Sequence, residues 1–225
     1  MTALTRDNGP MLWSTDFIAD AVAAGLEAHA RQDDLEQAVY GFDHLDELGL
    51  HPIVQQALRD ADIGVWPEQR YPSHWLKKSR SEGLRCDVVL TPDPGSSGLR
   101  DPEIRDTLFD LLPACDPEDA YWLEIKTVAQ YTVDGPFPRY TTELLSPVPK
   151  DIKKLWGDGI IRHAGLLLVL FAESKITAEH DLDTWYRKCL ERGYPLGAPA
   201  RRGFRITDRI GNGYCEVGVF AVRGV

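Results

Sequence analysis

The chain has 225 residues, of which 43% are hydrophobic and 27% charged, as expected for a globular protein with one sizeable core. The longest uninterrupted apolar stretch, residues 166–172, is too short to cross a membrane, and the first seven residues lack the apolar core of a signal peptide. The four cysteines form no Cys-x-x-Cys pair, which argues against a zinc site or a disulfide framework. We therefore expect one cytoplasmic domain, residues 1–225.

The net charge of −10 is unfavourable for a nucleic-acid partner, but it is unevenly distributed. Residues 1–60 hold three arginines and no lysine against eleven acidic residues, a balance of −8. Residues 187–209 hold seven basic residues against two acidic ones, a balance of +5. These segments are either solvated loops and faces, or basic clusters that hold a phosphate backbone while the acidic N-terminal part faces elsewhere.

The N-terminal part, residues 12–48, is predicted to be a helical extension. Ser14-Thr15-Asp16 is typical of a helix start, and Asp33-Asp34 is predicted to open a second helix that ends at Gly49. Pro52 suits the first turn of a third, short helix through Leu58. A strand from Ile63 to Tyr71 follows.

Two further strands carry ionisable residues between apolar ones. They are predicted over Leu84–Leu90, which contains Asp87, and Tyr121–Val128, which contains Glu124 and Lys126. Residues 91–120 between them are an insertion with a helix expected around residues 104–112. Burying three ionisable groups in strands costs several kcal/mol unless they are paired or bind a metal.

The C-terminal half continues the alternation of helix and strand. A helix is predicted from Lys150 to His163, followed by an apolar strand that suits the centre of a sheet covered on both faces. Residues 180–225 are expected to form a helix and a β-hairpin. The apolar strand is Leu166–Phe171, the helix is Leu182–Leu190, and the hairpin strands are Phe204–Ile210 and Tyr214–Val222, joined at Gly211-Asn212-Gly213.

Period-two alternation places Glu124 and Lys126 on the same side of their strand. A carboxylate from one strand, with a carboxylate and an ammonium from another, suits a hard divalent cation and an activated water. Thirteen glutamates and eight lysines predict roughly 0.5 Glu-x-Lys triplets by chance, so the triplet alone is weak. A second copy, Glu173-Ser174-Lys175, follows a strand and is interpreted as solvated charge.

The Asp87 strand and the Glu124-Ile125-Lys126 triplet resemble the PD-(D/E)XK nuclease superfamily, although Cys86 stands where the family name expects proline. The resemblance implies a restriction endonuclease-like α/β (α+β) fold: an αβββαβ core over residues 33–172, with a mixed sheet flanked by helices. It also implies that Asp87, Glu124 and the Ile125 carbonyl bind Mg²⁺ or Mn²⁺, and that Lys126 orients or deprotonates the attacking water.

In that family the helix before the first strand often adds another acidic residue to the metal site. The candidates are Glu36, Asp46 and Glu47, and we favour Glu47 as a further catalytic residue because it lies at the helix end nearest the strands. The six histidines show no metal-ligand spacing such as His-Glu-x-x-His, so none is assigned a ligand role.

The leading hypothesis is a Mg²⁺-dependent endonuclease that acts on DNA, alone, as a homodimer or with a partner subunit. Five basic residues are expected to hold phosphates beside the site: Lys77, Lys78, Arg80, Lys150 and Lys154. Two alternatives stay open. One is a nuclease fold that binds DNA without cutting and needs a partner, and the other is an unrelated α/β protein in which the triad is a structural salt bridge.

Overall fold

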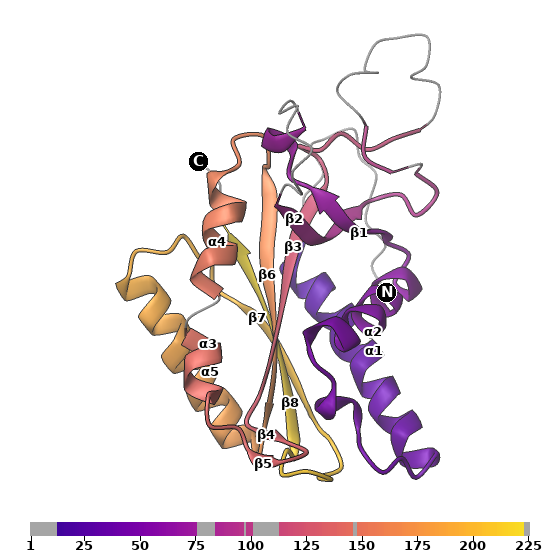
Figure 1. Ribbon diagram of the computed structural model, residues 1–225. Coiled ribbons are helices and arrows are strands. Elements are labelled where there is room, and N and C mark those ends of the chain that lie inside the picture. The colour runs from indigo at the N-terminus through magenta and orange to yellow at the C-terminus, as the bar shows by residue number, and fades with distance from the viewer. Residues whose placement is uncertain (1–12, 76–83, 97, 101–112, 146–147, 223–225) are drawn as a thin grey trace.

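The computed structural model describes residues 13–75, 84–96, 98–100, 113–145 and 148–222 (Figure 1). The helices in these ranges are α1 (Thr15–Leu35), α2 (Glu47–Asp60), α3 (Tyr140–Leu145), α4 (Val148–Gly157) and α5 (Lys175–Glu191). Two short 3-10 helices, η1 (Phe42–His44) and η2 (Pro72–His74), lie in the connections after α1 and β1.

One mixed sheet holds the strands β1 (Gly64–Arg70), β2 (Arg85–Thr91), β3 (Tyr121–Ala129), β6 (His163–Ala172), β7 (Ala200–Arg205) and β8 (Tyr214–Val222). Its strand order is β1-β2-β3-β6-β8-β7, in which β3 and β6 are parallel and the other neighbours antiparallel. A parallel pair needs a crossover, and α3 and α4 lie in the connection from β3 to β6. A small separate hairpin pairs β4 (Tyr131–Thr132) with β5 (Gly135–Pro136). The predicted mixed sheet with flanking helices is thus confirmed.

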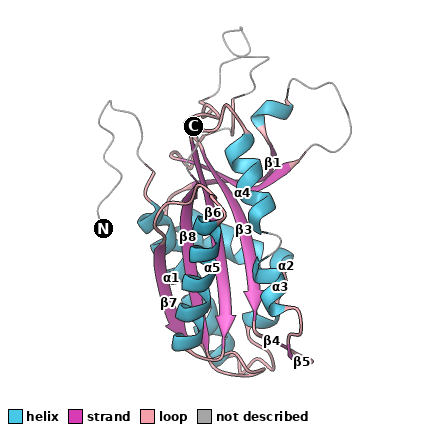
Figure 2. Cartoon of the chain, turned by 90° about the vertical axis from the view of Figure 1, so that its left-hand side faces the viewer, coloured by secondary structure: helices cyan, strands magenta, loops and turns pink. Residues whose placement is uncertain are grey.

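Helices cover both faces of this sheet. Figure 1 shows α1 and α2 on one side and α3, α4 and α5 on the other, and in Figure 2 α4 and α5 lie in front of the strands. Residues of β3 alternate between the two cores, since Trp122 packs on the α4–α5 side while Leu123 and Ile125 pack on the α1–α2 side. The apolar strand β6 contributes to both cores, as predicted for a central strand.

The two strands that carry the predicted site agree with the sequence analysis to within one residue. They pair with each other in antiparallel register, although the long insertion separates them in sequence. Within the described part of that insertion, Leu99 and Cys115 form an isolated bridge. The helix expected at residues 104–112 lies outside the described residues.

The predicted second helix, Asp33 to Leu48, is wrong. Helix α1 continues to Leu35, after which Gln37 adopts a left-handed backbone conformation with φ 54°. Asp33 does not open a helix, because its Oδ2 accepts a hydrogen bond from the N–H of Phe42 in η1. Helix α2 begins at Glu47, so Glu47 is the first residue of one helix and not near the last residue of another. Pro52 lies inside α2.

The predicted helix from Lys150 to His163 is too long. Helix α4 ends at Gly157, because Asp158 turns back to accept hydrogen bonds from the N–H groups of Ser73 and Ile160. His163 is therefore the first residue of β6 and does not lie on a helix.

The hairpin strand predicted at residues 204–210 lies earlier, over residues 200–205. The following loop is long because the buried side chain of Asn212 bonds to Asp43 and to the backbone of Tyr131 instead of forming a tight turn.

Candidate active site

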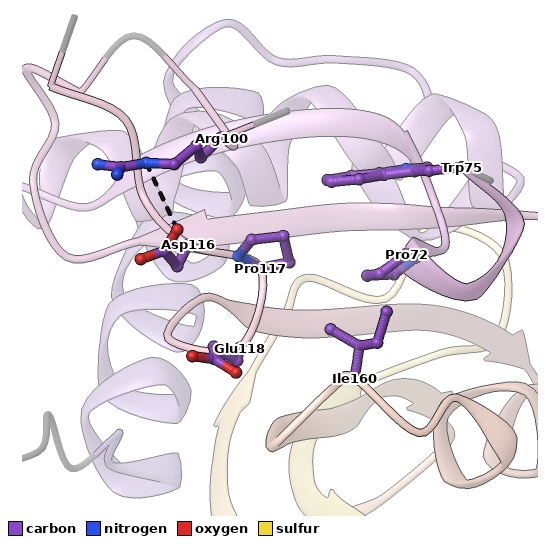
Figure 3. A pocket seen from close by; sticks show the side chains of 7 residues that line it. All are labelled: Pro72, Trp75, Arg100, Asp116, Pro117, Glu118 and Ile160. Atoms are coloured by element: carbon purple, nitrogen blue, oxygen red, sulfur yellow. Dashed lines mark ion pairs between the residues drawn. The ribbon is translucent and has the colours of Figure 1, made fainter. Parts of the chain in front are cut away.

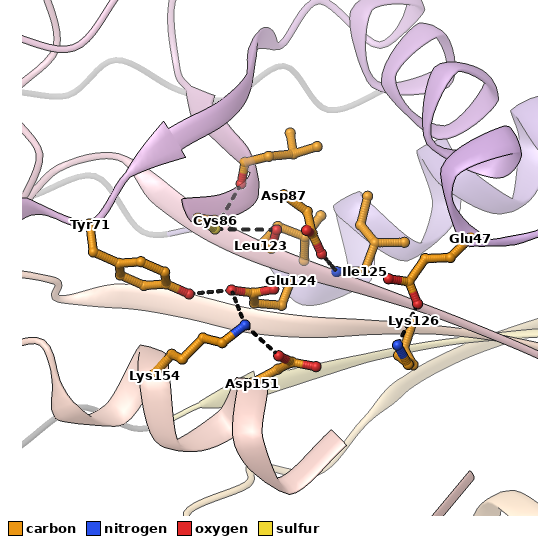
Figure 4. A network of polar contacts seen from close by, with 11 residues as sticks. Glu47, Tyr71, Cys86, Asp87, Leu123, Glu124, Ile125, Lys126, Asp151 and Lys154 are labelled. Atoms are coloured by element: carbon orange, nitrogen blue, oxygen red, sulfur yellow. Dashed lines mark hydrogen bonds and ion pairs between the residues drawn. The ribbon is translucent and has the colours of Figure 1, made fainter. Parts of the chain in front are cut away.

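Asp87 lies where strands β2 and β3 stop pairing. Their register ends at Val88 and Leu123, and Asp87 is the next residue on β2. Its Oδ2 atom accepts a hydrogen bond of 2.8 Å from the backbone N–H of Ile125, beside Glu124 (Figure 4). This bond holds the Asp87 carboxylate against β3 and so fixes its orientation. A role for the Ile125 carbonyl as a metal ligand stays a prediction.

Glu124 lies in the polar network on the α4 side of β3 and is only 2% exposed. The Tyr71 hydroxyl donates a hydrogen bond to its Oε1 atom, and Lys154 Nζ lies 3.8 Å from the same oxygen. Burial is the main cause that raises the pKa of Glu124 to about 9, and the Asp87 charge adds to it, whereas Tyr71 and Lys154 oppose it. Without a bound cation, burial in the folded protein therefore favours the protonated form of Glu124. Burial also raises the pKa of Tyr71, which keeps its hydroxyl a donor.

Lys154 belongs to the site instead of the solvent-facing side of its helix. Its Nζ atom lies 2.7 Å from Asp151 Oδ1, one turn away on α4, and points toward Glu124 (Figure 4). Burial lowers the pKa of Lys154, but the Asp151 hydrogen bond and the Glu124 and Asp87 charges outweigh burial and raise it. The predicted phosphate contacts of Lys154 and of Lys150, which is exposed on the same helix, stay predictions.

Lys126 is held by a residue from the opposite layer. Its Nζ atom lies 2.6 Å from Oε2 of Glu47 on α2, which packs on the other face of the sheet from α4. The long side chain reaches Glu47 beyond the point where β2 stops pairing with β3. Glu124 and Lys126 therefore end in different environments, although strand alternation predicted a shared one: Glu124 lies among Tyr71 and α4, and Lys126 against α2 (Figure 4).

A candidate metal site lies between α2 and β2. Glu47, His51 and Asp87 each offer one ligand atom, and these atoms all lie within 4.8 Å of one another. His51 is 6% exposed, and its Nε2 atom is buried with no hydrogen-bond partner among the described residues. A buried imidazole nitrogen without a partner is costly unless it binds something. Two carboxylates and an imidazole therefore fit a divalent cation, and the nitrogen ligand favours Mn²⁺ over Mg²⁺.

His51 is the site residue that the sequence analysis missed. Glu47 and His51 are four residues apart, so they share one face of α2. That spacing was visible in the sequence, but the wrong helix boundary separated Glu47 from His51. The other acidic candidates from this region are elsewhere, since Glu36 caps α1 and Asp46 caps α2 by accepting from the N–H of Gly49.

Three of the seven basic residues in the C-terminal segment 187–209 pair with acidic side chains, whereas Arg187, Arg192 and Arg205 are exposed. Arg201 pairs with Glu216 and Asp183, Arg202 with Asp16 and Asp20, and Arg209 with Asp34. Asp16, Asp20 and Asp34 of α1 thus face this segment, which corrects the interpretation that the acidic N-terminal part faces elsewhere. Three of the predicted phosphate contacts, Lys77, Lys78 and Arg80, lie outside the described residues.

The second Glu-x-Lys triplet lies at the junction of β6 and α5, away from this network. Glu173 accepts a hydrogen bond from Thr177, and Lys175 pairs with Glu179 on the exposed side of α5. This arrangement agrees with its interpretation as solvated charge.

No protein-family model matches the chain, and comparisons with curated proteins and with solved structures found no match either. Among the described residues, no helix is long and apolar enough to span a membrane.

Proposed function

We propose that this protein is a metal-dependent nuclease that hydrolyses phosphodiester bonds, with DNA as its substrate. The observation that carries the proposal is the position of Asp87, which belongs to the Glu47–His51 cluster and also lies close enough to Glu124 to raise its pKa. A buried acid with a perturbed pKa beside other carboxylates is typical of functional sites. The element order α2, β1, β2, β3, α4, β6 supports the resemblance to the PD-(D/E)XK superfamily.

The cation would be held by Glu47, His51 and Asp87, with Glu124 on the other side of Asp87. When bound, a divalent cation polarises the scissile phosphate and lowers the pKa of the attacking water. Its positive charge would also lower the pKa of Glu124, because it would offset the Asp87 charge that adds to the effect of burial.

The chain's own residues would position and stabilise the reacting groups. The N–H of Ile125 fixes one oxygen of Asp87 and so orients the other. Lys154, 3.8 Å from Glu124, stabilises the Glu124 carboxylate once its proton has left. Lys126, held by Glu47, would orient the water and offset the negative charge that develops on the phosphate in the transition state.

A second candidate function is DNA binding without cleavage, in which a partner subunit supplies the cut. The Lys126–Glu47 ion pair favours it. At 2.6 Å, the ammonium of Lys126 and the carboxylate of Glu47 bind each other instead of a water or a cation. The two functions differ in one outcome: the nuclease cuts alone, whereas the binding module binds DNA with salt-dependent affinity and leaves it intact.

The test is cleavage of plasmid and single-stranded DNA in Mn²⁺, in Mg²⁺ and in EDTA. The proposal expects cleavage with the cations and none in EDTA, and it expects Asp87→Asn to be folded and inactive. Glu173→Gln is the matched control from the second Glu-x-Lys triplet and should cut like the wild type. Cleavage by Asp87→Asn at the wild-type rate would overturn the assignment.

A further inference from the structure

A small cavity of about 130 Å³ lies beside the Glu124 network. Its apolar lining comes from Pro72, Trp75, Pro117 and Ile160, and an ion pair between Arg100 and Asp116 lies at one end (Figure 3). Pockets for drug-sized ligands run to about 300–1,000 Å³, so this cavity suits a single small ring system.

The cavity is joined to the candidate active site by short connections. Pro72 follows Tyr71, whose hydroxyl bonds to Glu124. The ring of Trp122 stacks on Tyr71 at 5.8 Å, and its Nε1 atom donates a hydrogen bond of 2.9 Å to the carbonyl of Pro117. Through these contacts the cavity lies on the Tyr71 side of the Glu124 network.

The chemistry of the lining suits a flat, uncharged ring. The indole of Trp75 is held in place by a hydrogen bond of 2.8 Å from Nε1 to the carbonyl of Arg70, so it presents a preorganised stacking surface. The charges around the cavity balance, since Arg100 pairs with Asp116 and Glu118 with Arg162. Among the described residues around the cavity, a phosphate therefore finds no net positive charge.

We propose that this cavity binds one unstacked nucleobase of the DNA strand, on Trp75, next to the scissile phosphate. The inference rests on the proposed nuclease function and extends it to a substrate class: single-stranded DNA or DNA with an unpaired base beside the cut. A fully paired duplex keeps its bases in the stack and would have to flip one out, at a cost of a few kcal/mol.

The test is fluorescence anisotropy with a labelled single-stranded oligonucleotide in Ca²⁺, using a series in which one abasic site moves along the strand. With the wild type, one position should raise the Kd about tenfold, which equals about 1.4 kcal/mol of lost stacking. In Trp75→Ala that position should lose its sensitivity, whereas Trp75→Phe should keep part of it. Tyr40→Ala, which removes an exposed aromatic ring between α1 and α2, is the control and should leave the pattern unchanged.

The possible failures are distinguishable. If the wild type binds the oligonucleotide but every abasic position has the same effect, or if Trp75→Ala retains the sensitive position, the base pocket is wrong and the nuclease proposal stands. If the wild type neither binds DNA in Ca²⁺ nor cuts it in Mn²⁺, the proposed function is overturned and the base pocket with it.

Discussion

The buried carboxyl of Glu124 makes the stability of the metal-free protein depend on pH. Its pKa rises from the ordinary value of 4.5 to about 9 in the folded chain, mainly through burial. The folded state therefore favours the protonated form, and this stabilisation is fully present below pH 4.5 and is lost as the pH rises toward 9. Between these values the free energy of unfolding falls by about 1.4 kcal/mol for each pH unit.

Substituting Glu124 with glutamine removes this proton linkage and keeps the shape of the side chain. From pH 6 to pH 8, the wild type should lose about 3 kcal/mol of unfolding free energy relative to Glu124→Gln. Urea unfolding at pH 6, 7 and 8 in EDTA measures the difference, with Glu173→Gln as a control that keeps the wild-type dependence. Parallel pH profiles for the wild type and Glu124→Gln would refute the raised pKa and with it the buried, protonated state of Glu124.

Three other variants test the remaining parts of the site. Lys126→Ala should abolish cleavage but retain Mn²⁺ binding, measured by isothermal titration. The control Lys175→Ala should cut DNA at close to the wild-type rate. Lost Mn²⁺ affinity in a folded Lys126→Ala variant would instead mean that Lys126 organises the carboxylates. His51→Ala should weaken Mn²⁺ binding by roughly tenfold or more because one ligand is lost, and unchanged affinity would exclude His51 from the site. Replacing Lys77 and Lys78 together with alanine should flatten the salt dependence of DNA binding by about two units, and an unchanged slope would mean that neither contacts a phosphate.

The sequence predicted the strands of this site better than its helices. Asp87 and Glu124 lie within short runs of β-branched and aromatic residues, and such runs have few alternatives to a buried strand. Helix boundaries were harder, because the apolar spacing of Leu35, Val39 and Leu48 continues a helical period although all three side chains are exposed. After α1, the hydrogen bond from the N–H of Phe42 to Asp33 fixes the path of the chain. The spacing of apolar residues does not predict this hydrogen bond.

The composition of the site depends on contacts that no sequence pattern expresses. Lys154 reaches Glu124 only because α4 packs over β3, and Lys126 reaches Glu47 only because β2 stops pairing with β3 at that level. The predicted strand alternation was correct for backbone positions but did not limit where a long lysine side chain ends. His51 lies beside Glu47 because α2 starts at Glu47 and so contains both residues. The predicted helix boundaries had placed Glu47 and His51 in different elements.

The proposed nuclease activity requires Asp87 to bind a divalent cation. A crystal of the protein soaked in Mn²⁺ and measured for anomalous scattering tests it most directly. We expect one strong anomalous peak at ligand distance from the Asp87 carboxylate, with His51 and Glu47 also in contact. A peak that avoids Asp87, or density at Asp87 that is unchanged after the soak, would contradict it.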